Sequence, residues 1–359
     1  MGAKVKAYIP IAGLLVGVFA LQGVLTATGK EFFLTQITMS IYYCLLIIGL
    51  CLLMGYAGQI SLGHAGFFAM GGYITAFLTT YNLTAFKESV FVKTMAAVGL
   101  LTKWEDLYGT EILSFKPVYA GLFAVLLTIV VAYLIGIPVL KLKGHYLAMA
   151  TLGFGIIIYR IVLATPQFGE ADGISDVPPF GLFGPLRISG EMDERVMNYY
   201  IAAFILVLGL FFLVNLVNSR VGRALRAIHG AEDAADSVGV DTATYKLKTF
   251  VLSAVYAAVA GVFLTHYNGG IGPSEASVMK SVRYVAIVAI GGMANLWGAL
   301  IMGLVLNFLS LRGYFGSYDD AVFGGILILI MLFAPQGLLR VQLIAGIRGV
   351  FARKGVVKD

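Results

Sequence analysis

The sequence predicts an all-α protein: a bundle of about ten membrane-crossing helices with cytoplasmic N- and C-termini. Three observations lead to this prediction. The chain is 59% hydrophobic and only 12% charged, whereas soluble domains contain roughly 25% charged residues. Apolar runs recur along the chain and approach the roughly 20 residues that a helix needs to cross a bilayer. Basic residues concentrate in alternate loops, as the positive-inside rule requires.

The apolar runs give the expected elements in chain order. The first run follows Lys4 and Lys6 and could be mistaken for a signal peptide, but it is longer than the apolar region of one. One run, 282–292, is short, so it is either a short crossing or a re-entrant half-helix. This leaves ten or nine crossings. The full set of runs covers residues 8–28, 34–55, 66–81, 118–140, 145–165, 199–217, 249–268, 282–292, 295–311 and 320–339.

Charge placement predicts the orientation of the bundle. With the N-terminus inside, the inner segments hold 14 Lys and Arg against 5 Asp and Glu, and the outer segments hold 9 against 14. The tail lies inside only if residues 282–292 cross the membrane. We therefore expect one domain, 1–359, with inner segments 1–7, 141–144, 218–248 and 340–359, an extracytoplasmic insertion at 82–117 and an extracytoplasmic loop at 166–198.

The residues inside the expected spans argue against a carrier driven by an ion gradient. Such carriers place a carboxylate or a lysine within a span, and the interiors of these spans contain no Asp, Glu or Lys. Arg160 is the clearest charge within a span, and it either extends to the interface or lines a cavity. The energy for transport is expected to come from elsewhere.

No pattern in the sequence predicts catalysis, a metal, a cofactor or nucleic-acid binding. The stretch GVLTATGKE (23–31) has the wrong glycine spacing for a phosphate loop and lacks its Ser or Thr. The four histidines are scattered, and no Ser-His-Asp set can be proposed. Cys44 and Cys51 lie two turns apart on one helical face, which does not suit a disulfide, so they are expected to be small buried apolar residues.

The stretch GYAGQISLGHAGFFAMGG (55–72) loosens the backbone directly after an apolar run. Irregular backbone at bilayer depth is tolerated only where it is buried in protein or lines a wet cavity. Its glycines allow helices to approach closely, and its polar side chains could satisfy freed backbone groups or a passing polar substrate. Tight packing alone is the other explanation for this stretch.

The segment 218–254 carries its own helical pattern on the inner side. Val221, Leu225 and Ile228 recur at helical spacing, with arginines between them. A second short helix follows, with small residues on one side, and Gly239 is expected to end it in a left-handed conformation. Such an elbow fits a groove on a partner, or it lies on lipid headgroups as a solvated loop; the pattern favours neither.

Six blocks of the chain resemble, in the family's order, the permease subunits of ATP-driven branched-chain amino acid importers of the LivM type. Together they cover most of residues 40–340. Two departures stand out: the 82–117 insertion is longer than usual, and Glu170 and Asp176 replace glycines in the outer loop. The blocks are GYAGQISLGHAGFFAMGGY (55–73), LKLKGHYLAMATLGFG (140–155), DGIS (172–175), RVGRALRAIHGAEDAADSVGVDTATYKLKTFVLSA (220–254), GGMANLWGALIMG (291–303) and LFAPQGLL (332–339).

The resemblance implies two groups of functional residues. Segment 218–248 would be the loop that contacts the ATPases. A second group would belong to the signature of the translocation pathway. The coupling-loop residues are Gly222, Arg223, Ala224, Arg226, Glu232, Ala234, Ala235 and Gly239, and the signature residues are Gly58, Gln59, Ser61, Gly63 and His64.

The resemblance also implies partners, substrates and location. The partners would be a second permease of the LivH type, two cytoplasmic ATP-binding-cassette (ABC) ATPases, an extracytoplasmic solute-binding protein and the lipid of the bacterial plasma (inner) membrane. Leucine, isoleucine and valine are the implied substrates, while urea, amides or other amino acids remain alternatives. The chain itself would not be an enzyme, because ATP hydrolysis would belong to the partners. An ATP-independent channel or facilitator is the alternative from another class.

Overall fold

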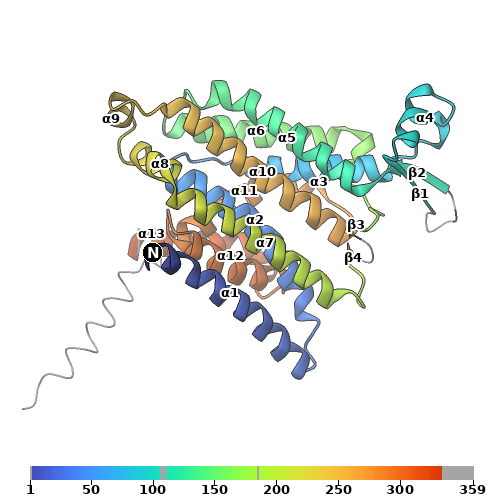
Figure 1. The fold of residues 1–359 in the computed structure, drawn as a ribbon, viewed down its shortest axis with the longest axis horizontal. Helices are drawn as coiled ribbons and strands as arrows, with labels where there is room; N and C mark the ends of the chain where they lie inside the picture. The colour runs from blue at the N-terminus through green and yellow to red at the C-terminus, as the bar shows by residue number, and fades with distance from the viewer. Residues whose placement is uncertain (1, 106–108, 110, 184–185, 334–359) are drawn as a thin grey trace, which may run out of the picture.

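The computed structural model describes residues 2–105, 109, 111–183 and 186–333. Each expected span coincides with a helix, as Figure 1 shows, and the helices of the bundle run side by side. The end of the last span and the basic tail 340–359 lie outside the described residues. The helices are α1 (Gly2–Ala27), α2 (Phe33–Cys51), α3 (His64–Thr80), α5 (Pro117–Val139), α6 (His145–Ala164), α7 (Arg195–Asn218), α10 (Thr242–Asn268), α11 (Val278–Gly291), α12 (Leu296–Leu311) and α13 (Asp319–Phe333).

Six of the described helices are long and apolar enough to cross a membrane: α1, α2 with its continuation to Tyr56, α5, α6, α7 and α10. The other four are shorter, between 14 and 17 residues. The prediction of an all-α membrane protein is therefore confirmed at this level. The count of ten crossings and the sidedness of the termini stay predictions.

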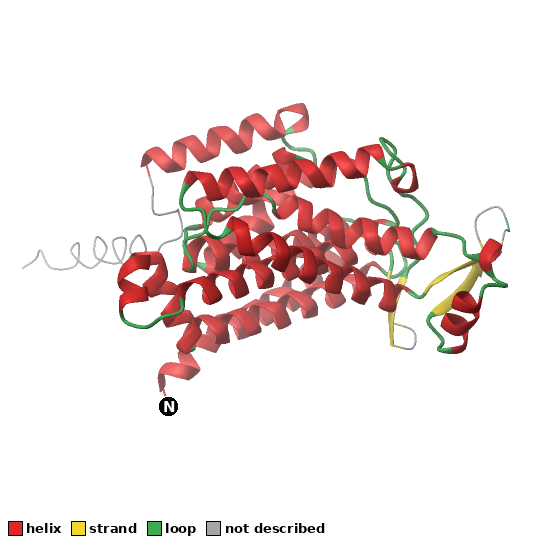
Figure 2. Ribbon diagram, turned by 90° about the horizontal axis from the view of Figure 1, so that it is seen from above, coloured by secondary structure: helices red, strands yellow, loops and turns green. Residues whose placement is uncertain are grey.

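The connections carry small elements, of which the sequence analysis predicted only the two short helices within 218–254. Two antiparallel hairpins form, and Figure 2 shows that the strands lie at one end of the bundle. These short hairpins lie in connections and leave the all-α class of the bundle unchanged. The connecting elements are η2 (Thr84–Phe86), α4 (Val90–Ala97), β1 (Leu101–Glu105), β2 (Glu111–Phe115), η3 (Pro166–Phe168), β3 (Phe180–Phe183), β4 (Leu186–Ile188), α8 (Arg220–Gly230), α9 (Glu232–Ser237), η4 (Pro273–Ala276) and η5 (Gly316–Tyr318).

The core forms where α2, α3 and α10 pack together. The α2 span has 89% of its most apolar window buried, whereas the α1 span has 11%. Small residues bring α3 and α10 together: a Cβ atom on Gly71 would overlap the backbone of Ala258, and one on Gly261 would overlap Phe68. Close backbone approach of this kind drives helix association in lipid, where the hydrophobic effect between helices is lost.

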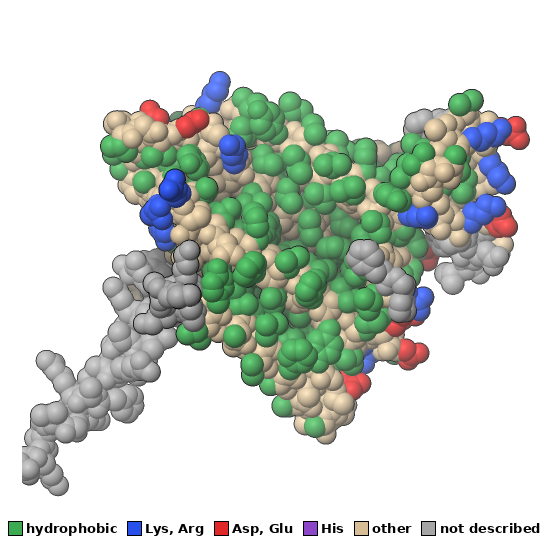
Figure 3. All heavy atoms as spheres, in the orientation of Figure 1, with side chains coloured by type: hydrophobic (Ala, Val, Ile, Leu, Met, Phe, Trp, Pro, Cys, Tyr) green, Lys and Arg blue, Asp and Glu red, His purple; other side chains and the backbone are tan. Residues whose placement is uncertain are grey.

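Charged side chains gather at two opposite ends of the molecule, and hydrophobic side chains cover the face between them (Figure 3). One end carries α8 and α9, and we call it the α8 end. The other carries the two hairpins, and we call it the hairpin end. The apolar belt includes half-exposed side chains along α5, such as Phe123, Val130 and Leu134. A surface of this composition suits contact with lipid or with another membrane subunit.

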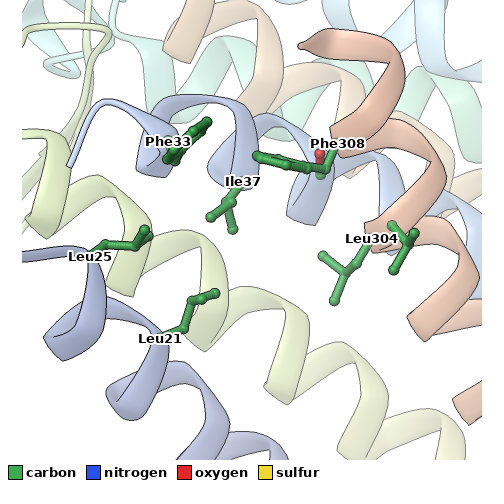
Figure 4. Close-up of a pocket in the computed structure, with 8 residues that line it drawn as sticks. Leu21, Leu25, Phe33, Ile37, Leu304 and Phe308 are labelled. Atoms are coloured by element: carbon green, nitrogen blue, oxygen red, sulfur yellow. The ribbon is translucent and has the colours of Figure 1, made fainter. Parts of the chain in front are cut away.

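An apolar groove of about 300 Å³ opens between α1, α2 and α12. Figure 4 shows Leu21 and Leu25 on one wall, with Phe33, Ile37, Leu304 and Phe308 completing it. Every lining side chain is hydrophobic except Ser40. The groove therefore suits an acyl chain or an apolar helix face, and it offers nothing to hold a polar solute.

Charged side chains within the spans differ in their exposure. Arg160 is exposed on the surface of the chain, which fits a side chain that extends to the interface. Arg283 in α11, which the sequence analysis did not single out, has a side chain that is only 14% exposed and bonds Asp320 at 2.9 Å. Acidic and lysine side chains also reach the packed interior, because the 269–277 connection brings Glu275, and the first turn of α11 brings Lys280, against Tyr43 in the middle of α2.

The lone cysteines behave as the sequence predicts. Cys44 and Cys51 are both free and buried, and each has a relative exposure of 0%. They serve as small apolar residues of the α2 face, with Cys44 against α12 through the Leu300 carbonyl oxygen. Both therefore contribute packing rather than a covalent bridge.

Candidate functional site

The signature segment begins with a break in the α2 helix. Residues Leu52–Tyr56 form a single π-helical turn, η1, and the next helix, α3, begins only at His64. A Cβ atom on Gly55 would overlap the backbone of Ala294, in the GGMANLWG block. Single π-turns inside α-helices are frequent at functional sites. The break therefore places two of the resembling blocks in contact.

Gly58 turns the chain between η1 and α3. Its φ is +69°, a conformation that suits glycine. A Cβ atom at this position would lie 2.8 Å from Nδ1 of His229, at the end of α8. The signature loop and the expected coupling loop, far apart in sequence, therefore touch at this point.

His64, at the start of α3, is the centre of a series of buried hydrogen bonds. Its Nδ1 lies 3.0 Å from the Ser61 hydroxyl, and its Nε2 lies 2.7 Å from the Ser253 hydroxyl in α10. Both His64 and Ser253 have a relative exposure of 0%. The next amide, of Ala65, donates to the Ser281 hydroxyl of α11 at 3.1 Å. These hydrogen bonds join α3, α10 and α11 through polar groups in an otherwise apolar core.

Gly63 lets the loop pack against α6. A Cβ atom on Gly63 would lie 2.5 Å from the carbonyl oxygen of Thr151. The Thr151 hydroxyl accepts a hydrogen bond from the Leu62 amide at 3.0 Å. The LKLKGHYLAMATLGFG block, which contains Thr151, is thereby fixed to the signature loop.

Gln59 is the exception among the signature side chains. Its relative exposure is 2%, yet neither atom of its side-chain amide has a hydrogen-bond partner among the described residues. Buried amides are nearly always paired, because an unpaired one costs free energy. Gln59 therefore presents an unpaired side-chain amide inside the bundle.

The expected coupling loop, 218–248, starts with a tight corner between α7 and α8. A Cβ atom on Gly222 would overlap the carbonyl group of Val217, so only glycine fits. The Arg226 guanidinium donates to that same Val217 oxygen at 3.1 Å, and Ser219 caps α8 through the Val221 amide. These contacts hold α8 at a set angle to α7.

Two ion pairs tie α9 to the rest of the molecule. Glu232 bonds Lys246 of α10 at 2.7 Å, and the Lys246 side chain is only 7% exposed. Asp233 bonds Lys143 of the α5–α6 connection at 3.0 Å, and both side chains are largely exposed. The hydrogen bond from Lys143 to Asp233 raises the pKa of Lys143 above its ordinary value.

The end of α9 confirms the expectation for Gly239 and corrects the expected helix faces. Gly239 has φ +85° and its amide bonds the Asp236 carbonyl at 2.9 Å, so it ends the helix. Ala235 is buried, but Ala234 is exposed and Val238 is 79% exposed. In α8 the buried stripe is Gly222, Leu225 and Ile228, so Val221 lies outside the stripe in which it was expected.

The expected site residues thus fall into a buried set and an exposed set. Gln59, Ser61, Gly63 and His64 are buried in the core, and Gly222 and Ala235 are buried at the α8 end. Ala224 and Glu232 are half-buried. The exposed members are Gly58, Arg223, Arg226, Ala234 and Gly239.

Sequence reasoning missed the residues that connect these two sets. His229 was expected to be an isolated histidine, and Thr151, Ser253 and Ser281 lie within apolar helices with no local pattern. Lys246 pairs with a residue 14 positions away. Thr151 and Ser253 interrupt apolar runs, and nothing in the local sequence around His229, Ser281 or Lys246 indicates their contacts.

Comparison with known proteins places the chain in a family. A family model described as the permease component of a branched-chain amino acid transport system matches residues 32–331. The chain is 32% identical over 323 residues to the high-affinity branched-chain amino acid transport system permease protein LivM of Escherichia coli, an alignment covering 84% of this chain and 68% of that protein. It is 25% identical over 309 residues to permease protein BraD of Pseudomonas aeruginosa, covering 84% and 93%.

A second branch of permeases is also similar. Permease protein LivH of Salmonella typhimurium is 27% identical over 319 residues, covering 84% of this chain and 92% of that protein. No solved structure matches the chain at a significant level.

These matches cover the π-turn, the signature loop and the coupling loop described above, and they agree with the apolar helices of the bundle. The chain is accordingly a multi-pass protein of the bacterial inner membrane. It belongs to the family of permease components of branched-chain amino acid transport systems.

Proposed function

We propose that this chain forms the translocation pathway of an ABC importer for leucine, isoleucine and valine. Relatives from two permease branches carry branched-chain amino acid transport in their names. The partners would be a LivH-type permease, two ABC ATPases that hydrolyse ATP, and a solute-binding protein that delivers the substrate. Apolar grooves such as the one beside α1 would hold lipid or the second permease.

We place the α8 end in the cytoplasm and the hairpin end outside. The basic excess of the inner segments supports this orientation. A crossing by the segment that ends in α11 is supported by its contacts, because Ile271, at the start of the connection that leads through η4 to α11, pairs with Ile174 at the hairpin end. After α11, Ala294 contacts Gly55 near the α8 end. In this arrangement the chain crosses ten times, and both termini and the tail 340–359 lie inside.

The observation that carries the proposal is the contact between α8 and the signature loop. His229, at the end of α8, contacts Gly58. His64 follows Gly58 in the sequence and begins the series of buried hydrogen bonds that leads into the core. Closure of the ATPases would move α8 together with α7, because Gly222 and Arg226 fix the corner between them. Such coupling requires the ATP-bound and ATP-free states to contact α8 differently.

Arg226→Glu tests this proposal. In cells that lack other leucine uptake and express the complete system, we expect the initial rate of radiolabelled leucine uptake to fall at least tenfold. The glutamate cannot donate to the Val217 oxygen, and its carboxylate is repelled by that oxygen, so α8 loses its fixed angle.

Arg226→Lys is the matched control, because it keeps a positive donor, and it should retain most of the uptake. Equal membrane levels of both variants must be verified by immunoblotting. Unchanged uptake by Arg226→Glu would favour a facilitator that works without the ATPases and would count against coupling through α8.

A further inference from the structure

A cluster of charged and aromatic side chains lies where the 269–277 connection enters the bundle. Glu275 of η4 and Lys280 of α11 form an ion pair at 2.9 Å, with side chains only 18% and 21% exposed. The Tyr43 hydroxyl of α2 donates to Glu275 at 2.9 Å and accepts from Lys280 at 3.3 Å. The signature loop and the α8 contacts do not involve this cluster.

The cluster lies deep along the helices. Tyr43 is ten residues into α2, which is about 15 Å along the axis and about half of a hydrocarbon core about 30 Å thick. Ala276 packs beside Ala69 and Tyr73 in the middle of α3. With 14 residues, α11 spans only about 21 Å. The crossing is therefore a broken one, in which an irregular segment descends and α11 completes the path.

Several polar groups in this cluster have no partner. Both donors to Glu275 converge on its Oε1, while Oε2 is buried and has no hydrogen-bond partner among the described residues. The hydroxyls of Tyr73 and Tyr284 are likewise buried and unpaired in the described part of the chain. Lys280 uses two of the three donors that an ammonium group carries. Buried polar groups are rarely left unpaired, so this cluster offers donors and acceptors that a polar ligand can bond.

The charges of the cluster specify the ligand chemistry. The free carboxylate oxygen of Glu275 suits an ammonium group. Lys280 and the N-terminus of α11 suit a carboxylate, because the positive end of the helix dipole lies there. The pair has no net charge, so a zwitterion fits without burying an excess charge, which would be costly. Tyr43 stacks on Phe68 with ring centroids 5.7 Å apart, and Tyr284 lies 6.1 Å from Tyr43; these rings suit an apolar side chain.

We propose that Glu275, Lys280 and the aromatic residues around Tyr43 bind a zwitterionic, apolar α-amino acid midway through the membrane. Glu275 Oε2 takes the ammonium group, and Lys280 takes the carboxylate. This inference rests on the proposed function, since it assigns the substrate of that transporter to particular side chains. Amino acids with a net charge are excluded, because the site would then hold an uncompensated charge.

The first test exchanges the charges in the complete transporter. Glu275→Gln and Lys280→Met should each lower the maximal rate of leucine uptake at least tenfold. The double variant Glu275→Lys/Lys280→Glu restores an ion pair but presents it in reverse. We expect it to assemble with the partner subunits, as measured by co-purification, and still to transport at less than a tenth of the normal rate. Glu191→Gln, which breaks an exposed Glu–Arg pair, is the matched control and should transport normally.

The second test detects the ligand directly. The complete transporter in lipid nanodiscs is irradiated with a diazirine analogue of leucine, and adducts are mapped by mass spectrometry. We expect adducts on peptides containing Tyr43 or Tyr284, and at least fivefold fewer in Glu275→Gln. Normal uptake by the reversed pair, or adducts confined to other parts of the chain, would overturn the site while leaving the proposed function intact. Absence of leucine uptake by the unaltered transporter would instead overturn the proposed function, and the site with it.

Discussion

Single residues decide how closely the helices of this bundle approach one another. A Cβ atom on Gly63 would meet the Thr151 carbonyl group, whereas one on Gly153, two residues after Thr151 in α6, would have no neighbour within 4 Å. Both glycines look alike in the sequence. Only the packing distinguishes a glycine that is required from one that is tolerated.

Gly63→Ala should therefore reduce leucine uptake at least tenfold and destabilise the protein by about 1 to 3 kcal/mol, the usual cost of overpacking. The added methyl group must separate the loop from α6. Gly63→Leu should abolish uptake while the chain still inserts into the membrane. Thermal unfolding of the purified protein and uptake in cells measure the two effects.

Gly153→Ala is the matched control for that experiment. It adds the same methyl group into open space, and alanine favours a helix over glycine by up to about 1 kcal/mol. Its uptake should be normal and its stability equal or higher. Equal losses in both variants would show that the contact with Thr151 does not matter.

Glu194 gives the loop before α7 a dependence on pH. The Ser189 hydroxyl donates to Glu194 at 2.7 Å, and Arg187 donates at 2.6 Å. The Ser189 bond, with a smaller contribution from Arg187, holds the pKa of Glu194 below its ordinary value. Because the pKa is lower in the folded than in the unfolded state, this stabilisation is complete above the unfolded value of about 4.3 and is lost as the pH falls through the folded value.

Hydrogen exchange in residues 186–194 should consequently accelerate below about pH 4, the ordinary range of a glutamate pKa, relative to the intrinsic rate at each pH, because protonated Glu194 releases both donors. In Glu194→Gln the protection should be weaker at neutral pH and nearly independent of pH. A wild-type protein whose protection stays constant as the pH falls from neutrality through this range would contradict the assignment.

At the scale of elements, the α8–α9 elbow is attached to the bundle by contacts of unequal burial. The Glu232–Lys246 pair is largely buried, whereas the Lys143–Asp233 pair is exposed. Breaking a buried pair leaves a charge without water or partner, but an exposed pair contributes little. The first pair therefore carries the attachment of α9 to α10.

Glu232→Gln should lower leucine uptake several-fold and reduce the fraction of ATPase subunits that co-purify with the chain, because Lys246 loses its counter-charge and α9 shifts. Asp233→Asn removes the neighbouring carboxylate of the same helix and should leave both quantities close to normal. Equal effects of the two substitutions would show that burial does not distinguish the pairs.

At the scale of the whole molecule, the path of α11 (278–291) sets the sidedness of everything after it. If 278–291 crosses, the connection between α12 and α13 lies outside with the hairpins. If it turns back, that connection lies inside with α8. Tyr314 in this connection is 67% exposed, so a reporter there distinguishes ten crossings from nine.

Cysteine labelling tests the proposed ten crossings. Tyr314→Cys should react with a membrane-impermeant maleimide in spheroplasts, as should Glu191→Cys in the outer loop. Ser237→Cys in α9 should react only after permeabilisation. The native Cys44 and Cys51 are buried and give little background. Labelling of Tyr314→Cys only after permeabilisation would support the re-entrant arrangement with nine crossings.

The sequence by itself determined the membrane class and the long helices, while the resemblance of six blocks indicated the family and the two loops that it implies are functional. The class and the helices follow from local information, namely apolar length and charge placement. Gly239 likewise marks a point where the backbone requires glycine. A short apolar run also marked the unusual segment at 282–292, although its composition could not show whether the segment crosses the membrane or turns back.

Only the tertiary structure decided which distant groups meet. His229 reaches Gly58, Ser253 reaches His64, and Glu275 reaches Tyr43 across 232 positions. No local pattern around His229, Ser253 or Glu275 indicates these partners, because each partner depends on how the helices pack. The irregular segment before α11 and the first turn of α11 likewise place Glu275 and Lys280 in the interior, although in the sequence both residues lie outside the expected spans. Periodicity describes one helix at a time, whereas a polar group buried in a bundle is satisfied by its neighbours in space.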